Sequence, residues 1–195
     1  MDDIVRDYDN GDPSGVQRVG APIDGTAFFP GGHGLWRGTE PHGPLPEFFP
    51  RNPVMFVGHN FDSVRGYERS RQRGIELIRN TTWAKLLQYI AAAGLSPEEC
   101  FFTNALMGLQ PATSVGRLKT TELFRAECRQ FLSEQVRIVR PRAIAALGPV
   151  AAQDLDRLDT GLPVIALKHP YATIRLPDLA VTEGARLKSL LEAQR

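Results

Sequence analysis

Polar residues that could take part in chemistry follow directly after short apolar runs in this sequence. The first run, Val-Met-Phe-Val at 54–57, is followed by Gly, His, Asn, Phe, Asp and Ser at 58–63. Such a run is typical of a strand buried on both faces of a sheet. In an open parallel sheet, ligands bind beyond the carboxyl ends of the strands, so 58–63 is a candidate site. By itself it could equally be a capped turn, since Asn, Asp and Ser are common in turns and at helix N-caps.

The same arrangement recurs three times further along the chain. The later apolar runs are 100–102, 143–147 and 163–167, and the residues that follow them include Asn104, Gly148 and His169. With His59 and Asn60, these ends would bring two asparagines and two histidines to one sheet edge. An asparagine side chain offers one acceptor and two donors, which suits the carbonyl and ring N–H of a pyrimidine. A histidine beside a carbonyl oxygen can stabilise charge that develops there.

The segments between the apolar runs are the elements that must hold these strand ends in place. Helices are predicted over 82–93, 121–140, 149–158 and 182–193, and Ser-Pro-Glu-Glu at 96–99 has the pattern of a capping box. Short buried strands alternating with helices predict a parallel sheet covered on both faces. We therefore expect the α/β class, as a three-layer α/β/α sandwich with a four-stranded, mostly parallel central sheet.

Length and composition predict one soluble domain over 1–195, since 42% hydrophobic and 23% charged residues are ordinary for a globular protein. The net charge of +1 shows no whole-chain bias toward nucleic acid. Cys100 and Cys128 lack metal-ligand spacing, so we expect buried reduced thiols and a cytoplasmic location. The acidic N-terminus predicts no signal peptide, and no apolar run is long enough to span a membrane.

Residues 1–50 are rich in Gly, Pro and Asp, which predicts an irregular N-terminal wrap and not a separate domain. Aromatic groups such as Phe28 and Phe29 would anchor this wrap to the body. The glycine-rich stretch 31–34 lacks the strand and helix that a phosphate-binding loop requires. His33 and His42 have no third ligand at matching spacing, so we expect no metal site.

The segment 64–80 is rich in arginine. Its arginines are Arg65, Arg69, Arg71, Arg73 and Arg79, against two glutamates. A charged run of this kind can be a solvated helix face. It can also bind a phosphate backbone, where arginines supply affinity without sequence information. The excess of positive charge favours the second interpretation.

The motifs at the strand ends resemble those of the uracil-DNA glycosylase superfamily, in their order along residues 50–175. Gly58-His59-Asn60 is similar to the first motif of that family in its asparagine-bearing form. Phe102-Thr103-Asn104 looks like the strand that reads uracil, and His169-Pro170-Tyr171 looks like the last motif. Residues 142–148 resemble the strand and glycine that precede this last motif.

The resemblance implies a role for each matching residue. Asn60 would position the attacking water, Asn104 would pair with the flipped base, and His169 would hydrogen-bond the departing uracil. Residues of the same motifs, Gly58, His59, Phe61 and Tyr171, would line the base pocket. The iron–sulfur branch of the family has cysteine ligands that this chain lacks, so no cofactor is expected.

Two departures from the family pattern bear on activity. Phe61-Asp62 replaces the Pro-Gly of the first motif, and Asp62 could either activate the water or repel DNA phosphate. Tyr171 stands where the family usually has serine. Phe61, Tyr67 and Trp83 are candidates for the aromatic ring that stacks on the base, although Trp83 also fits the core.

Three functions are therefore open. The leading one is a DNA glycosylase that hydrolyses the N-glycosidic bond of uracil or a related damaged base, in base excision repair. The alternative is a non-catalytic protein of the same fold that binds nucleic acid or a nucleobase. A third, an unrelated α/β hydrolase, would need Ser63 as its nucleophile. For the first two we expect a monomer that binds DNA and no membrane.

Overall fold

Four parallel strands form the centre of the molecule. The computed structural model describes residues 15–17, 19–40, 42–75, 78, 82–111, 120–173 and 177–194. The strands are β1 (Val54–Asn60), β2 (Cys100–Leu106), β3 (Ala143–Leu147) and β4 (Val164–Leu167). They lie in the order β2-β1-β3-β4, and every neighbouring pair is parallel. This confirms the predicted four-stranded sheet and makes it wholly parallel.

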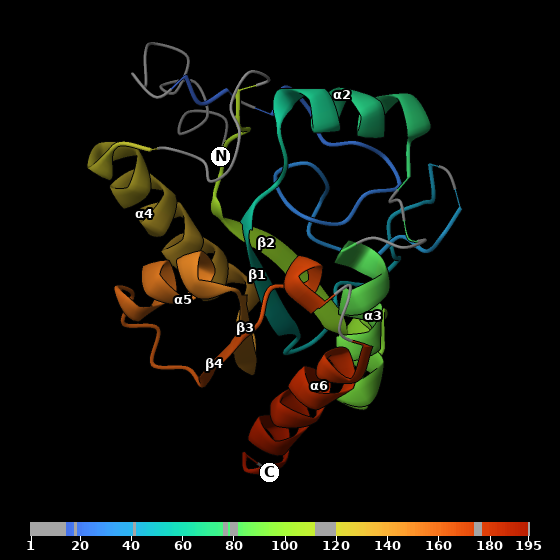
Figure 1. Cartoon of the computed structure of the whole chain (residues 1–195), viewed down its shortest axis with the longest axis vertical. Helices are drawn as coiled ribbons and strands as arrows, with labels where there is room; N and C mark the ends of the chain where they lie inside the picture. Colours follow the sequence, from blue (N-terminus) through green and yellow to red (C-terminus); the bar gives the residue numbers. More distant parts are fainter. Residues whose placement is uncertain are drawn as a thin grey trace.

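Helices cover both faces of the sheet (Figure 1). Helices α3 (Thr82–Ala92) and α6 (Pro177–Glu192) lie on one face, and α4 (Glu122–Val139) and α5 (Pro149–Asp156) lie on the other. Helix α2 (Val64–Arg73) follows β1 beyond the carboxyl end of the sheet. The short 3₁₀ helices η2 (Pro97–Glu99) and η3 (Pro170–Thr173) lie next to β2 and β4 in sequence. The α/β/α layering is confirmed.

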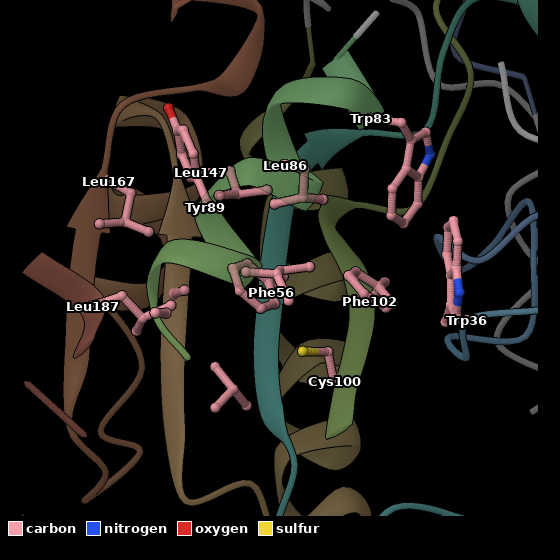
Figure 2. Close-up of a cluster of buried hydrophobic side chains, with 14 of the residues drawn as sticks. Trp36, Phe56, Trp83, Leu86, Tyr89, Cys100, Phe102, Leu147, Leu167 and Leu187 are labelled. Atoms are coloured by element: carbon pink, nitrogen blue, oxygen red, sulfur yellow. The ribbon is translucent and has the colours of Figure 1, made fainter. Parts of the chain in front are cut away.

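Alternation along the strands divides the interior into two cores. On β1, Val54 and Phe56 pack toward α3 and α6, while Met55 and Val57 pack toward α4 and α5. Figure 2 shows the first core, in which Phe56 and Phe102 lie beneath Leu86 and Tyr89 of α3. Both faces of the sheet are apolar because both are covered, as a parallel sheet requires.

Several element boundaries differ from the predictions. Strand β2 continues through Leu106, so Asn104 lies inside the strand and not after it. The described part of the arginine-rich segment contains helix α2, which ends at Arg73 because the left-handed backbone of Gly74 (φ +63°) allows its N–H to reach the Ser70 carbonyl. Helix α6 begins at Pro177, five residues before the predicted start, because proline is well suited to a first helical turn.

Residues 15–50, within the described part, form the expected irregular wrap. Phe28 packs against Trp83 and Phe102, with ring centroids 5.4 Å apart in both pairs, and Phe29 packs against Phe131. The predicted aromatic anchoring is confirmed for Phe28 and Phe29, whereas Phe48 of the second aromatic pair in this segment, Phe48-Phe49, is 76% exposed. Residues 1–14 lie outside the described part. Cys100 and Cys128 are buried reduced thiols, as expected. None of the helices among the described residues could cross a membrane.

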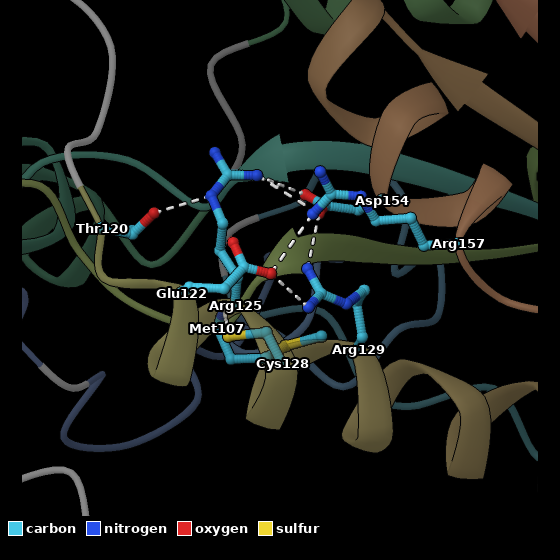
Figure 3. Close-up of polar contacts among 8 residues, drawn as sticks. All are labelled: Met107, Thr120, Glu122, Arg125, Cys128, Arg129, Asp154 and Arg157. Carbon is cyan, nitrogen blue, oxygen red and sulfur yellow. Dashed lines mark hydrogen bonds and ion pairs between the residues drawn. The ribbon is translucent and has the colours of Figure 1, made fainter.

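A buried ion network joins α4 to α5 (Figure 3). Asp154 of α5 accepts from Nη1 of Arg125 at 3.1 and 3.2 Å and from Nη1 of Arg129 at 3.4 Å. The Asp154 side chain is 1% exposed, and the two arginines are 20% and 15% exposed. Glu122 binds Arg129 at 2.7 Å on the solvent side, and this hydrogen bond lowers the pKa of Glu122. The network ties the two helices together on one face of the sheet.

Candidate functional site

The strand register brings the first two motifs together at the carboxyl edge of the sheet. Gly58 of β1 is the direct neighbour of Asn104 on β2. A Cβ atom on Gly58 would lie 2.5 Å from Asn104 Oδ1, which is too close for any ordinary contact. Gly58 is therefore the residue that makes room for the Asn104 carboxamide.

The orientation of the Asn104 carboxamide is fixed by the N-terminal wrap. Its Nδ2 donates to the Phe29 carbonyl at 2.7 Å, and the residue is 2% exposed. A carbonyl oxygen can only accept, so the amide nitrogen must face Phe29, and Oδ1 then faces Gly58. Asn104 thus presents an acceptor on the β1 side and retains a second N–H on its nitrogen.

Asn60, the last residue of β1, is held by the turn that follows it. Its Nδ2 donates to the Asp62 carbonyl at 2.9 Å, and the same carbonyl accepts from the Gln110 N–H at 2.9 Å. The second bond ties this turn to the chain beyond β2. Because this bond uses Nδ2, it leaves the side-chain oxygen of Asn60 as a hydrogen-bond acceptor.

The Asp62 carboxylate faces the start of α2. Its Oδ1 accepts from the Ser63 N–H at 2.6 Å and from the Ser63 hydroxyl at 3.3 Å, and the carboxylate lies against the Cα of Gly66. Ser63 Oγ in turn caps α2 by accepting from the Gly66 N–H at 3.1 Å. A negative charge at a helix N-terminus is favourable, so Asp62 stabilises this end of α2. Ser63, the nucleophile of the third function considered, is a helix cap.

His169 is held in one tautomer by its own turn. The Tyr171 N–H donates to His169 Nδ1 at 3.2 Å, so in the neutral ring Nδ1 is the acceptor and Nε2 carries the hydrogen. Burial lowers the pKa of His169, which favours this neutral ring. Gly148, at the end of β3, has φ +91°, and a Cβ there would lie 3.1 Å from the Cβ of His169. Gly148 therefore lets the His169 turn pack closely on the sheet edge.

The other residues expected in the base pocket have varied positions. His59 is half-buried on β1 and, by strand alternation, faces the opposite side of the sheet from Gly58 and Asn60. The Phe61 ring lies against Gly31 and packs edge-on to Tyr67 at 6.2 Å. The Tyr171 side chain is 70% exposed.

The two other rings considered for base stacking have structural contacts. Tyr67 is buried, and its hydroxyl exchanges hydrogen bonds with the backbone of Ala21 at 2.9 and 3.1 Å. Trp83 lies in the core between Trp36 and Phe102, with centroid distances of 5.1 Å to each. The prediction that Trp83 belongs to the core is confirmed.

Sequence reasoning missed two residues of the wrap that touch the site. Phe29 supplies the carbonyl that orients Asn104, and the half-buried Phe28 ring reaches within 3.4 Å of a Cβ position on Gly58. The one available signal was the apolar group at 27–29 in a segment otherwise poor in apolar residues. That signal indicated an anchor but not what it contacts.

The arginines of α2 are all exposed. Arg65, Arg69 and Arg73 are spaced by four residues and share one side of the helix, whereas Arg71 lies off this side. Arg79 lies outside the described residues. With a single glutamate in the helix, α2 carries a basic stripe directly after the Asn60 turn.

No group of three potential metal ligands is present among the residues that the structure describes. A pocket of about 380 Å³ lies at the opposite, amino end of the sheet, where Arg142 and Lys188 face Glu99 and Glu192. None of the strand-end residues lines this pocket. The residues expected to carry the chemistry therefore lie away from this pocket.

A comparison with protein families finds a match. The family model described as Uracil DNA glycosylase superfamily matches residues 45–191, which is most of the chain. The chain belongs to this superfamily. A comparison with curated proteins finds no significant match.

The superfamily match includes every strand-end residue from Gly58 to Tyr171 and also α2. It begins at residue 45, so Phe28 and Phe29 lie outside the matched segment. This uracil DNA glycosylase superfamily member therefore completes its site edge with residues from outside the family segment.

Proposed function

We propose that the protein is a DNA glycosylase that hydrolyses the N-glycosidic bond of uracil or a related damaged base. The observation that carries this proposal is the hydrogen bond from the Tyr171 N–H to His169 Nδ1. It leaves Nε2–H as a neutral donor at the same sheet edge as Asn60 and Asn104. Superfamily membership supports the reaction class.

The role assigned to His169 is to stabilise the leaving base. When the bond between C1′ of the sugar and N1 of uracil breaks, its electron pair moves onto the ring and partly onto O2. A donor already aimed at O2 stabilises this charge without reorganisation. A neutral imidazole donates its hydrogen bond and retains its proton.

The role assigned to Asn60 is to position the attacking water. The side-chain oxygen of Asn60 accepts a hydrogen bond from the water and so directs the water oxygen at C1′. The water oxygen bonds to C1′, and its proton must be taken up. Asp62 is the candidate acceptor for this proton, and a rotation of its carboxylate away from Ser63 would be required.

Base recognition is assigned to Asn104, with Gly58, His59, Phe61 and Tyr171 as its surroundings. The Asn104 oxygen accepts from the N3–H of uracil, and its second N–H donates to O4. The base must leave the helical stack to reach this edge, so the duplex has to be held nearby. Arg65, Arg69, Arg71 and Arg73 of α2 would bind the backbone phosphates.

The test is base release from oligonucleotides that contain one uracil opposite guanine, opposite adenine, or in a single strand. We expect free uracil and an abasic site in equal amounts from at least one of the three. The Asn60→Ala protein, purified identically, controls for contaminating glycosylase and should release at least ~100-fold less. Release that is equal for the two proteins, or absent with all three substrates, would contradict the proposal.

A second candidate is a non-catalytic protein that binds nucleic acid or a nucleobase. It is favoured by the Asp62 carboxylate, which could repel DNA phosphate and which is held by Ser63 at the start of α2. This candidate predicts binding of the same oligonucleotides without release of any base. The same experiment therefore separates the two functions.

A further inference from the structure

The backbone N–H and carbonyl of Lys168, the residue directly before His169, are bound by two side chains from different helices. Its N–H donates to Glu183 Oε2 of α6 at 2.7 Å. Its carbonyl accepts from the Tyr89 hydroxyl of α3 at 3.0 Å. Both polar groups of this single residue are thus satisfied by side chains 15 and 79 positions away in the sequence.

The position of Lys168 in the sheet explains why side chains are needed there. The β3–β4 register ends with the pair Leu147 and Leu167, so Lys168 is one residue beyond the last paired position. Backbone groups that leave a sheet near the core must find other partners. Here the partners are Glu183 and Tyr89, whose side chains take the place of a neighbouring strand in binding the Lys168 backbone.

Glu183 is itself fixed. It is 3% exposed, and both its carboxylate oxygens accept from Nη1 of Arg186 at 2.9 and 3.0 Å. Arg186 also donates to the carbonyl of Ala166 in β4 at 3.2 Å. A buried carboxylate is tolerated because it is paired and hydrogen-bonded in this way. Glu183 therefore connects α6 to both β4 and the turn that carries His169.

Tyr89 is fully buried, and its ring lies in the core cluster between α3 and the sheet (Figure 2). Its hydroxyl is at the edge of that cluster, where it meets the Lys168 carbonyl. A buried tyrosine hydroxyl needs a hydrogen-bond partner, and a rigid ring gives that partner a fixed position. The two bonds approach the same residue from α3 and from α6.

We propose that Glu183 and Tyr89 are positioning residues for His169, which hold the Lys168 peptide so that His169 Nε2–H is directed at the leaving base. The expected effect of these residues on excision rests on the proposed glycosylase function, whereas their expected effect on the His169 ring does not. Small displacements of an aligned group reduce rates strongly, by up to about 100-fold for 1 Å. Neither residue contacts the base in this assignment, since each acts through the backbone.

The first measurement is the tautomer of His169, read from ¹⁵N–¹H NMR of the imidazole rings. The chain has four histidines, so the His169 signals are assigned by their loss in His169→Gln. In the wild type we expect hydrogen on Nε2. In Tyr89→Phe, which keeps the ring, and in Glu183→Ala, we expect exchange-broadened or mixed-tautomer signals, with partial recovery in Glu183→Gln, whose amide oxygen can still accept from Lys168.

The second measurement is single-turnover uracil excision with the affinity for DNA measured in parallel. Tyr89→Phe and Glu183→Ala should reduce the excision rate about tenfold, with Glu183→Gln between Glu183→Ala and the wild type, and with DNA affinity unchanged. Glu192→Gln, at the exposed end of α6, is the matched control and should change neither signal nor rate.

The outcomes separate this inference from the proposed function. Unchanged His169 signals in folded Tyr89→Phe and Glu183→Ala would overturn it, whether or not the protein excises uracil. Altered signals in a protein that excises no base would uphold the positioning role and contradict only the glycosylase proposal. If Glu183→Ala does not fold, Tyr89→Phe alone decides.

Discussion

The state of the His169 ring is set by two local features. The Tyr171 N–H occupies Nδ1, and burial lowers the pKa of the ring. Protonation at Nδ1 would remove the acceptor of that N–H and release the ring from its turn. At the scale of one residue, the proposed chemistry therefore depends on keeping His169 neutral.

This dependence predicts the acid limb of the pH profile. The excision rate should be constant above the ordinary histidine pKa of about 6.5 and should fall only below it, because the lowered pKa keeps His169 neutral to a lower pH. The lowered pKa of His169 also makes the free energy of unfolding depend on pH. The contribution of the neutral ring to stability is complete above about pH 6.5 and is lost as the pH falls. Single-turnover rates between about pH 5 and pH 8 measure the limb, which should be absent in His169→Gln. A decline that begins above pH 6.5, or that persists in the variant, would be inconsistent with this assignment.

Gly58 gives a second prediction at the residue scale. In Gly58→Ala the new methyl group would lie 2.5 Å from Asn104 Oδ1, so the carboxamide must move and strain its bond to Phe29. We expect weaker uracil recognition, with excision reduced at least tenfold, and a loss of stability of about 1 kcal/mol. Excision kinetics and chemical denaturation measure the two effects. Ser133→Ala, exposed on α4, is the control, and wild-type excision by Gly58→Ala would refute the assigned contact.

At the scale of elements, the network around Asp154 is the strongest polar contact between α4 and α5. Asp154→Ala would leave Arg125 and Arg129 without their buried partner. We expect a loss of about 3 kcal/mol in the free energy of unfolding, because both arginines are largely shielded from water. Glu134→Ala breaks an exposed ion pair with Arg137 and should cost less than about 0.5 kcal/mol. Equal losses in urea denaturation would show that the network is not stabilising in this way.

Helix α2 makes a separate prediction about DNA binding. Arg65→Gln and Arg69→Gln should weaken binding to DNA of any sequence and reduce the slope of log affinity against log salt by about 0.9 for each phosphate that is no longer neutralised. Fluorescence anisotropy over a range of salt concentrations measures this slope. Arg137→Gln on α4 is the matched control. A salt slope unchanged in the α2 variants would make the stripe an ordinary solvated surface.

The elements themselves were largely predictable from the sequence. Each strand begins with an apolar run, and the capping box at Ser96 forms as predicted, with the Glu99 side chain bound to the Ser96 N–H at 2.8 Å. The position of Asn104 was not predictable to the residue, because a polar residue in a buried strand is stable only with a partner. That partner, the Phe29 carbonyl, is 75 positions away, and no local pattern reveals such a contact.

At the scale of the whole molecule, the candidate site is assembled from distant parts of the chain. The strand ends, the wrap at Phe29, and the helices that hold Lys168 all meet at one edge of the sheet. Order along the chain predicted which strand ends converge, since parallel strands point the same way. The contacts of Asn104 with the Phe29 carbonyl, and of Lys168 with Tyr89 and Glu183, depend on tertiary packing, which no short motif of the sequence reveals.

The most direct test of this account is the single-turnover rate of uracil excision by the wild type, Asn60→Ala and His169→Ala, with DNA affinity measured for each. We predict that both variants bind DNA within about threefold of the wild type and excise uracil at least ~100-fold more slowly, which is the usual range when a catalytic group is removed. Wild-type rates in both variants, or weakened binding with an unchanged rate once DNA is bound, would show that the carboxyl edge of the sheet is not where the bond is broken.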